Sequence, residues 1–149
     1  MEKQPNILVI DAQGGGIGRL LVSAIRQELP GVSVTAVGGN SAATAAMLKA
    51  GADQGATGEN AVVVACRRAD VILGPIGIVI ADAMLGEITA KMAAAVARSG
   101  AKRILIPFDH CDNIVVGVRE SSMKTLVKEA VSVLAETVRG GDGRCGGPS

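Results

Sequence analysis

Aromatic side chains are nearly absent from this chain of 149 residues. It contains one Phe, Phe108, and neither Trp nor Tyr. Proteins that hold single-stranded nucleic acid stack the bases on aromatic rings, so that kind of platform is excluded. The charges also balance, with 15 Lys and Arg against 14 Asp and Glu, and they form no basic stripe of the kind that DNA binders carry. We therefore expect no nucleic-acid partner.

Paired cysteines and long apolar runs are missing as well. The three cysteines show no C-x-x-C spacing, which argues against a disulfide framework and against a structural zinc site. The longest uncharged apolar stretch, residues 71–81, contains Pro75 and is shorter than the roughly 20 residues that a membrane helix needs. The residues before Ile7 do not have the pattern of a secretory signal. We predict no metal site, no membrane partner and a cytoplasmic location.

Aliphatic residues dominate instead, and 48% of the chain is hydrophobic, which is enough for a buried core. The most informative stretch begins with an apolar run, residues 7–10, that ends at Asp11. A glycine-rich turn, residues 13–18, then leads into an amphipathic segment, residues 19–29. Glycines let the backbone turn sharply beside a ligand, and the start of the next helix directs N–H groups at an anion. This succession is typical of nucleotide-binding α/β proteins.

The alternation of strand and helix continues along the chain. We expect strands at residues 7–10, 32–37, 53–56, 71–73 and 103–107. We expect helices at residues 19–29, 41–49, 57–69, 90–98 and 121–138, with Asn40 or Ser41 capping the second and Thr89 the fourth. The pattern predicts an α/β fold with a three-layer, doubly wound, mostly parallel five-stranded sheet of Rossmann-like type. Residues 1–139 would form one domain, followed by a flexible Gly-rich tail, residues 140–149.

Three segments leave alternatives open. Residues 61–65 compete with residues 53–56 for the third strand because of their β-branched content. Residues 78–85 fit either a helix or an extended chain. Residues 114–118 fit a short extra strand.

Right-handed crossovers place the turns after all five strands at one edge of such a sheet. These turns are residues 13–18, 38–41, 57–60, 74–77 and 108–113, and four of the five are rich in Gly, Asn, Ser or Thr. Ligands in open α/β sheets bind at that edge, so we expect several turns to contribute to one site. The candidate ligand-binding residues are Asp11, Gln13, Gly14, Gly15, Gly16, Ile17, Gly18, Asn40, Ser41, Thr57, Asn60, Gly74, Pro75 and Ile76.

The first turn only partly fits the dinucleotide fingerprint G-x-G-x-x-G. Gly15 and Gly18 match the second and third glycines, but Gln13 stands at the first. The acidic residue that holds the ribose about 20 positions later is missing, and no Gly-Lys-Ser/Thr follows, which excludes a P-loop. We interpret residues 14–18 as a site for a phosphate or nucleotide, with NAD less well supported. A purely structural tight turn is the alternative.

The other candidates each admit two interpretations. Asp11 would either hold Mg²⁺ beside a phosphate or accept hydrogen bonds from loop amides. The polar residues of the second and third turns would contact a sugar or another polar edge of the ligand, or they would cap helices. The turn at residues 74–77 would either approach the ligand with its backbone or simply end a strand.

No complete catalytic apparatus is visible. Asp109, His110, Cys111 and Asp112 are the one cluster that joins a nucleophile, a base and carboxylates. Neighbours within one turn rarely point at one centre, so a polar loop is the alternative. Asp82, among apolar residues, would be a general base if burial raised its pKa, or else a hydrogen-bonding loop residue. The sequence does not decide whether the protein is an enzyme.

Several phrases of the sequence together resemble a known family. They are Val9-Ile10-Asp11, Gly14-Gly15-Gly16-Ile17-Gly18, Asn40-Ser41-Ala42 and the stretches 47–52, 55–61 and 74–78. On these phrases the chain, over about residues 7–118, is similar to an uncharacterised bacterial domain-of-unknown-function family of short Rossmann-like proteins. The resemblance implies the fold and no particular activity. The glycine turn is also similar to that of short-chain dehydrogenases, but their Tyr-x-x-x-Lys catalytic pair cannot exist in a chain without Tyr.

The sequence favours binding of a nucleotide or another phosphate-bearing small molecule at the carboxyl edge of the sheet. One alternative is an NAD(P)-dependent enzyme whose site is completed by a second subunit of a homo-oligomer, with the Ala-rich helix at residues 90–98 as the close-packed face. The other is a non-catalytic regulatory subunit that binds a protein.

Overall fold

The computed structural model describes residues 4–107, 113–118 and 121–140. Five parallel strands form one sheet in the order β3-β2-β1-β4-β5. The strands are β1 (Asn6–Asp11), β2 (Ser33–Gly38), β3 (Gln54–Thr57), β4 (Val71–Pro75) and β5 (Lys102–Ile106). The predicted doubly wound, Rossmann-like α/β fold is therefore confirmed, and the sheet is parallel throughout.

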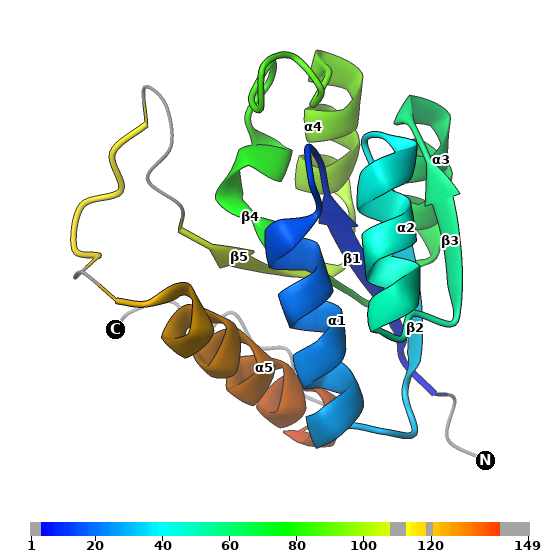
Figure 1. The fold of residues 1–149 in the computed structure, drawn as a ribbon, viewed down its shortest axis with the longest axis vertical. Coiled ribbons are helices and arrows are strands. Elements are labelled where there is room, and N and C mark those ends of the chain that lie inside the picture. Colours follow the sequence, from blue (N-terminus) through cyan, green and yellow to red (C-terminus); the bar gives the residue numbers. More distant parts are fainter. Residues whose placement is uncertain (1–3, 108–112, 119–120, 141–149) are drawn as a thin grey trace.

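Helices cover both faces of the sheet (Figure 1). They are α1 (Gly16–Glu28), α2 (Ser41–Ala50), α3 (Glu59–Arg68), the short 3-10 helix η1 (Ile76–Val79), α4 (Ala90–Arg98) and α5 (Met123–Gly140). One apolar core joins the sheet to α1, α2 and α5, and the other joins it to α3 and α4. None of the helices in the described part of the chain is long and apolar enough to span a bilayer.

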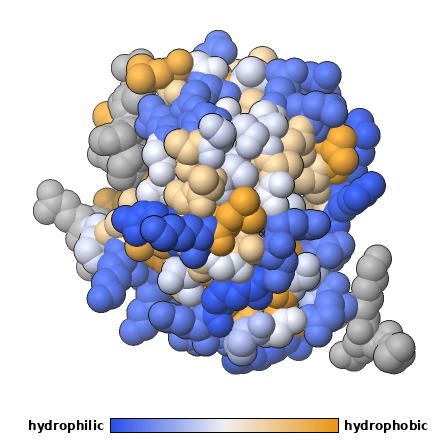
Figure 2. Space-filling view, turned by 45° about the vertical axis from the view of Figure 1, so that its right-hand side comes forward, coloured by the Kyte–Doolittle hydropathy of each residue, from blue (hydrophilic) through white to orange (hydrophobic). Residues whose placement is uncertain are grey.

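The continuous apolar run in β1 reflects burial on both faces of the sheet. Ile7 and Val9 belong to the core beneath α1, whereas Leu8 and Ile10 belong to the core beneath α3 and α4. A central parallel strand has this pattern because helices cover it on both sides. On the outer surface drawn in Figure 2, hydrophilic side chains surround small apolar patches.

The predicted caps and most helix positions are confirmed. Asn40, rather than Ser41, caps α2 by accepting a hydrogen bond from the N–H of Ala43 at 2.9 Å. Thr89 caps α4 as expected. For α5, the start expected at Ser121 lies slightly too early, because the helix begins at Met123.

Three segments differ from the predictions or resolve them. Residues 61–65 lie inside α3, so the third strand is the edge strand at residues 54–57, whose four residues are all exposed. Residues 78–85 form neither a regular helix nor a strand beyond η1. The extra strand at residues 114–118 is wrong: Ile114 and Val116 are 82% and 93% exposed, so their apolar character does not mark a buried strand.

The turn expected at residues 74–77 also begins later than predicted. Gly74 and Pro75 are still part of β4, where they pair with Leu105 and Ile106 of β5. Glycine is required at residue 74, because a Cβ there would collide with the carbonyl oxygen of Ile10 on the neighbouring strand. The Gly-rich segment 141–149 lies outside the described residues.

Candidate functional site

A pocket lies where the order of the strands changes direction. The chain runs outward from β1 through β2 to β3, and then returns to place β4 on the other side of β1. The helices that follow β1 and β4 consequently cover opposite faces of the sheet, which leaves a crevice beyond the carboxyl ends of these two strands. The pocket has a volume of about 290 Å³. Its lining consists of Asp11, Ala12, Gln13, Gly14, Gly16, Ile17, Pro75, Ile76, Gly77, Ile80, Ala83, Met84 and Asn113.

The four glycines of the first turn have two different roles. Gly15 has a φ of +71°, and a Cβ on it would lie 2.9 Å from the Cα of Ala43 in α2. A Cβ on Gly18 would lie 2.5 Å from the sulfur of Met47. These two glycines are therefore required for packing α1 against α2. Gly14 and Gly16, by contrast, line the pocket, and a Cβ on either would meet no atom within 4 Å.

Asp11 holds the turn to the start of α1. Its side chain is 4% exposed and accepts hydrogen bonds from the N–H of Ala12 at 2.8 Å and from the N–H of Gly18 at 2.7 Å. Burial raises the pKa of the Asp11 carboxyl above its ordinary value, although these N–H donors partly oppose the rise. These are the contacts expected if Asp11 bonds loop amides. It also supplies the acidic partner that the first turn of α1 lacks.

Glu87 joins the first turn to the second. Its Oε2 accepts a hydrogen bond from the N–H of Gln13 at 2.6 Å, and its Oε1 accepts one from Nδ2 of Asn40 at 2.5 Å. The Nδ2 of Asn40 also donates to the carbonyl oxygen of Gln13 at 2.8 Å. Glu87 thus connects loops that are far apart in the sequence. No sequence pattern marked this residue, because its partners lie 74 and 47 positions away.

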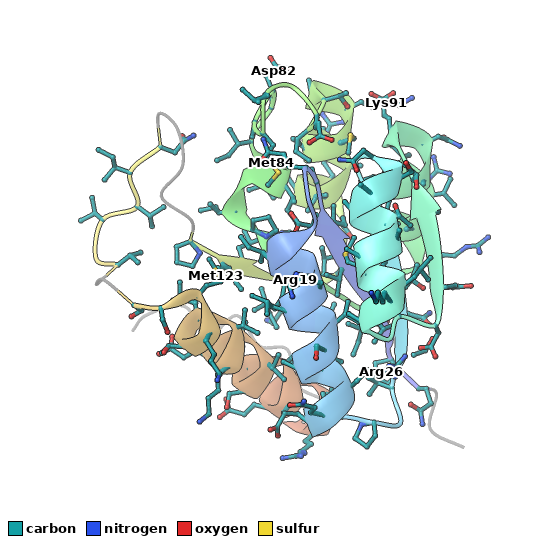
Figure 3. The ribbon with its side chains drawn as sticks, viewed as in Figure 1. Arg19, Arg26, Asp82, Met84, Lys91 and Met123 are labelled. Carbon is teal, nitrogen blue, oxygen red and sulfur yellow. The ribbon has the colours of Figure 1, made fainter. Side chains whose placement is uncertain are left out.

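The segment that follows η1 and forms part of the pocket wall has a left-handed backbone at several residues. Asp82, Met84 and Leu85 have φ angles of 65°, 57° and 58°, a left-handed conformation that non-glycine residues rarely adopt. Hydrogen bonds between residues 82 and 88 hold this segment, among them Asp82 N–H to the carbonyl oxygen of Ile88 at 2.7 Å. Figure 3 shows Met84 above the start of α1 and Asp82 at the outer end of the segment. Ile80, Ala83 and Met84 were not among the predicted site residues, because no residue type in this segment indicates left-handed backbone.

The polar residues of the second and third turns do not reach this pocket. The side chain of Asn40 is engaged by Ala43, Gln13 and Glu87. The hydroxyl of Thr57 lies 2.7 Å from the hydroxyl of Thr44, over the far half of the sheet. Ser41 and Asn60 are also absent from the described lining of the pocket. Of the five turns at this edge, the described lining draws on the first, the fourth and, through Asn113, the fifth.

Of the two suggested catalytic groups, the structure describes only Asp82. Asp82 is exposed, so the expectation of a buried carboxyl in an apolar setting is wrong: the left-handed backbone turns it outward. Residues 109–112 lie outside the described residues. Within residues 4–107, 113–118 and 121–140, no three His, Cys, Asp or Glu side chains are grouped closely enough to hold a metal ion.

Comparison with solved structures finds chains of similar fold, among them the following two. An FMN-dependent UbiX-like decarboxylase from Escherichia coli O157:H7, a dodecamer, is 20% identical, with a TM-score of 0.45 over 87% of this chain and 76% of that one. An imine reductase from Myxococcus stipitatus, in complex with NAD⁺, is 22% identical, with a TM-score of 0.46 over 70% of this chain and 32% of that one. A search of curated proteins finds no match.

A family model, in contrast, matches residues 6–139, which is most of the chain. It describes a domain of unknown function, DUF3842. The resemblance noted from the sequence phrases is thereby confirmed, and the chain belongs to the DUF3842 family.

Proposed function

We propose that this protein binds a nucleotide or another phosphate-bearing small molecule in the pocket between the ends of β1 and β4. The observation that carries the proposal is the position of Gly14 and Gly16. Both line a pocket at the point where the strand order reverses; Gly16 begins a 13-residue helix, and Gly14 lies two residues before it. Ligands of open α/β sheets bind at this position, and phosphates favour the amino ends of helices.

The backbone of the turn offers donors for a phosphate. In the described part of the chain, the N–H groups of Gly14 and Gly16 donate to no protein group, whereas those of Gln13, Gly15 and Gly18 are already engaged. Two unengaged N–H groups beside a pocket suit a phosphate oxygen, and the partial positive charge at the start of α1 adds to the attraction.

The other side of the pocket suits an apolar or ring-shaped group. Pro75, Ile76, Ile80 and Met84 form most of this wall. Ligand pockets are commonly lined in this way, with a few polar groups that orient the ligand against an apolar surface. A phosphate at Gly14 and Gly16 would thus place the rest of the ligand over η1.

A ligand screen tests the proposal directly. Thermal melts would be recorded with AMP, ADP and ATP, each with and without Mg²⁺, and with NAD, NADP, FMN, S-adenosylmethionine and sugar phosphates. A ligand at 100 times its Kd stabilises a protein by about 2.7 kcal/mol. For a protein of this size that corresponds to a rise in Tm of about 5–10 °C.

Two glycine variants make the screen specific. Gly16→Val adds a branched side chain that meets no protein atom at its Cβ but projects into the pocket, so it should abolish the rise in Tm. Gly31→Val is the matched control, because a Cβ on Gly31 also meets no atom within 4 Å and the residue does not line the pocket. A folded protein that no compound stabilises, or a rise that survives in Gly16→Val, would refute the proposal.

A further inference from the structure

We propose that the pocket accepts mononucleotides, with one phosphate and one ring system, and that Glu87 and Asn40 exclude NAD-type dinucleotides from it. This inference rests on the proposed function, since it narrows the ligand class of the same site. The glycine turn is open toward the pocket beside η1, whereas hydrogen bonds of Glu87 and Asn40 close its side toward the end of β2.

A dinucleotide needs space on both sides of the turn. Its pyrophosphate lies at the start of the helix after the first strand, and one ribose extends to the end of the second strand, where an acidic side chain binds its hydroxyls. Here β2 ends at Gly38, and the next two residues are Gly39 and Asn40. The side chain of Asn40 is therefore the polar group at the position that the ribose would need.

The side chain of Asn40 is engaged inside the protein through both its oxygen and its nitrogen. Its Oδ1 accepts from the N–H of Ala43 at 2.9 Å, and its Nδ2 donates to the carbonyl oxygen of Gln13 at 2.8 Å and to Oε1 of Glu87 at 2.5 Å. Both hydrogens of the amide group are thus used inside the protein. A sugar hydroxyl could accept a hydrogen bond from Asn40 only by displacing Gln13 or Glu87 from its amide group.

Glu87 closes the path between the two turns. It binds Gln13 on one side and Asn40 on the other, so its carboxylate lies across the way from the pocket to the end of β2. Gly39 also packs closely here, since a Cβ on it would lie 3.1 Å from the Cβ of Ala12 and 3.6 Å from Oε1 of Glu87. A second phosphate that passed this point would meet both a steric barrier and a negative charge.

The size and charge of the open side fit a single phosphate. The volume of about 290 Å³ is at the lower end of the range for small-molecule pockets, roughly 300–1,000 Å³. Asp11 is the one charged side chain among the described lining residues, and it is acidic. That set holds no cation, so the added repulsion of each further phosphate is opposed by the two backbone N–H groups and the partial positive charge at the start of α1.

Titration calorimetry with matched ligands tests the inference. AMP and NMN would be compared with NAD, which joins these two units, and FMN with FAD. We expect a mononucleotide to bind the wild-type protein at least tenfold more tightly than the dinucleotide that contains it. In Glu87→Ala, the affinity for the dinucleotide should rise at least tenfold relative to the affinity for its mononucleotide.

Two further variants complete the design. Asn40→Ser keeps an oxygen that can cap α2 and removes the amide donors to Gln13 and Glu87 without adding a charge, so it should admit dinucleotides even if Glu87→Ala fails to fold. Glu59→Ala is the control, because Glu59 is an acidic residue of a neighbouring turn that accepts a hydrogen bond from Thr89 and does not line the pocket. It should leave both affinities unchanged.

The outcomes separate the two proposals. If NAD or FAD binds the wild-type protein as tightly as its mononucleotide, the exclusion is wrong, but a nucleotide site remains. If sugar phosphates bind and no nucleotide does, the ligand class is wrong, but phosphate binding remains. If no phosphate-bearing compound binds to the folded protein, both proposals are overturned.

Discussion

Two adjacent glycines, Gly15 and Gly16, should respond in opposite ways to the same substitution. In Gly15→Ala the new methyl group has to occupy a left-handed residue with a φ of +71°, which costs about 1–2 kcal/mol. It also overlaps backbone atoms of Ala43, at 2.9 Å from Cα and 3.0 Å from the carbonyl oxygen. Overpacking of this kind costs typically about 1–3 kcal/mol, since α2 has to move away from α1.

A smaller effect acts in the other direction. Replacing Gly by Ala reduces the conformational freedom of the unfolded chain, which favours the folded state by about 0.4–1 kcal/mol. The balance for Gly15→Ala is therefore a loss of about 1–5 kcal/mol in the free energy of unfolding. In a protein of this size such a loss lowers Tm by about 2–18 °C.

Gly16→Ala is the matched variant. A Cβ on Gly16 meets no atom within 4 Å, and the residue begins α1 with ordinary backbone angles. We expect its free energy of unfolding to be unchanged or to rise by up to about 1 kcal/mol. Urea titration and calorimetry of both variants would measure the difference. Equal stabilities for Gly15→Ala and Gly16→Ala would refute the division of the turn into packing glycines and pocket glycines.

Three further predictions concern other parts of the chain. Leu85→Gly should raise the free energy of unfolding by about 0.5–1 kcal/mol, because Leu85 has a left-handed backbone and is 93% exposed. Ile114 is also apolar and exposed but is not left-handed, so Ile114→Gly should give no gain in stability in urea titration. Asp53→Asn should destabilise the protein by about 0.5–1 kcal/mol at pH 7, a small value because the side chain of Asp53 is half exposed to solvent. The main cause is the hydrogen bond from the N–H of Val34, which holds the pKa of Asp53 below 3.8. That contribution is present above pH 4 and disappears as the pH falls through the lowered pKa, so the stabilities of the two proteins in urea titrations should converge at acidic pH. Burial raises the pKa of Cys66 to about 11, so at pH 8 a thiol reagent should label Cys66 only after denaturant is added. Peptide mass spectrometry would detect the label, and rapid labelling of the native protein would contradict the burial of Cys66.

Much of the fold was predictable because its signals are local. The strand of residues 7–10 was visible as an uninterrupted apolar run, and the caps at Asn40 and Thr89 were visible from the residue types that begin helices. The third strand was ambiguous for a physical reason. It lies at the edge of the sheet with all four residues exposed, so it carries no apolar pattern, whereas the helix after it is rich in valine.

The candidate site was predictable only in part. The glycine turn and its place at the carboxyl edge followed from the sequence, but the division of labour among its glycines depends on where α2 lies. The wall formed by Ile80, Ala83 and Met84 depends on left-handed backbone that non-glycine residues do not indicate. The strand predicted at residues 114–118 was wrong because it depended on apolar residues such as Val116, which are exposed, and hydrophobic character alone does not establish burial.

The carboxylates of Asp11 and Glu87, which both accept hydrogen bonds from the glycine turn, differ in the length of the chain segment between each carboxylate and its donor. The hydrogen bond from Gly18 to Asp11 spans seven positions, whereas the one from Gln13 to Glu87 spans 74. Loop-closure entropy makes the longer closure more costly by about 2 kcal/mol when each contact forms alone. The glycine turn of the pocket is thus a local structure that can form early in folding. The wall formed by the residues after β4 can form only once β4 has joined the sheet. A molecule that opens locally at β4 would keep its glycine turn and lose its pocket, and the exchange of the Gln13 amide hydrogen would report that opening.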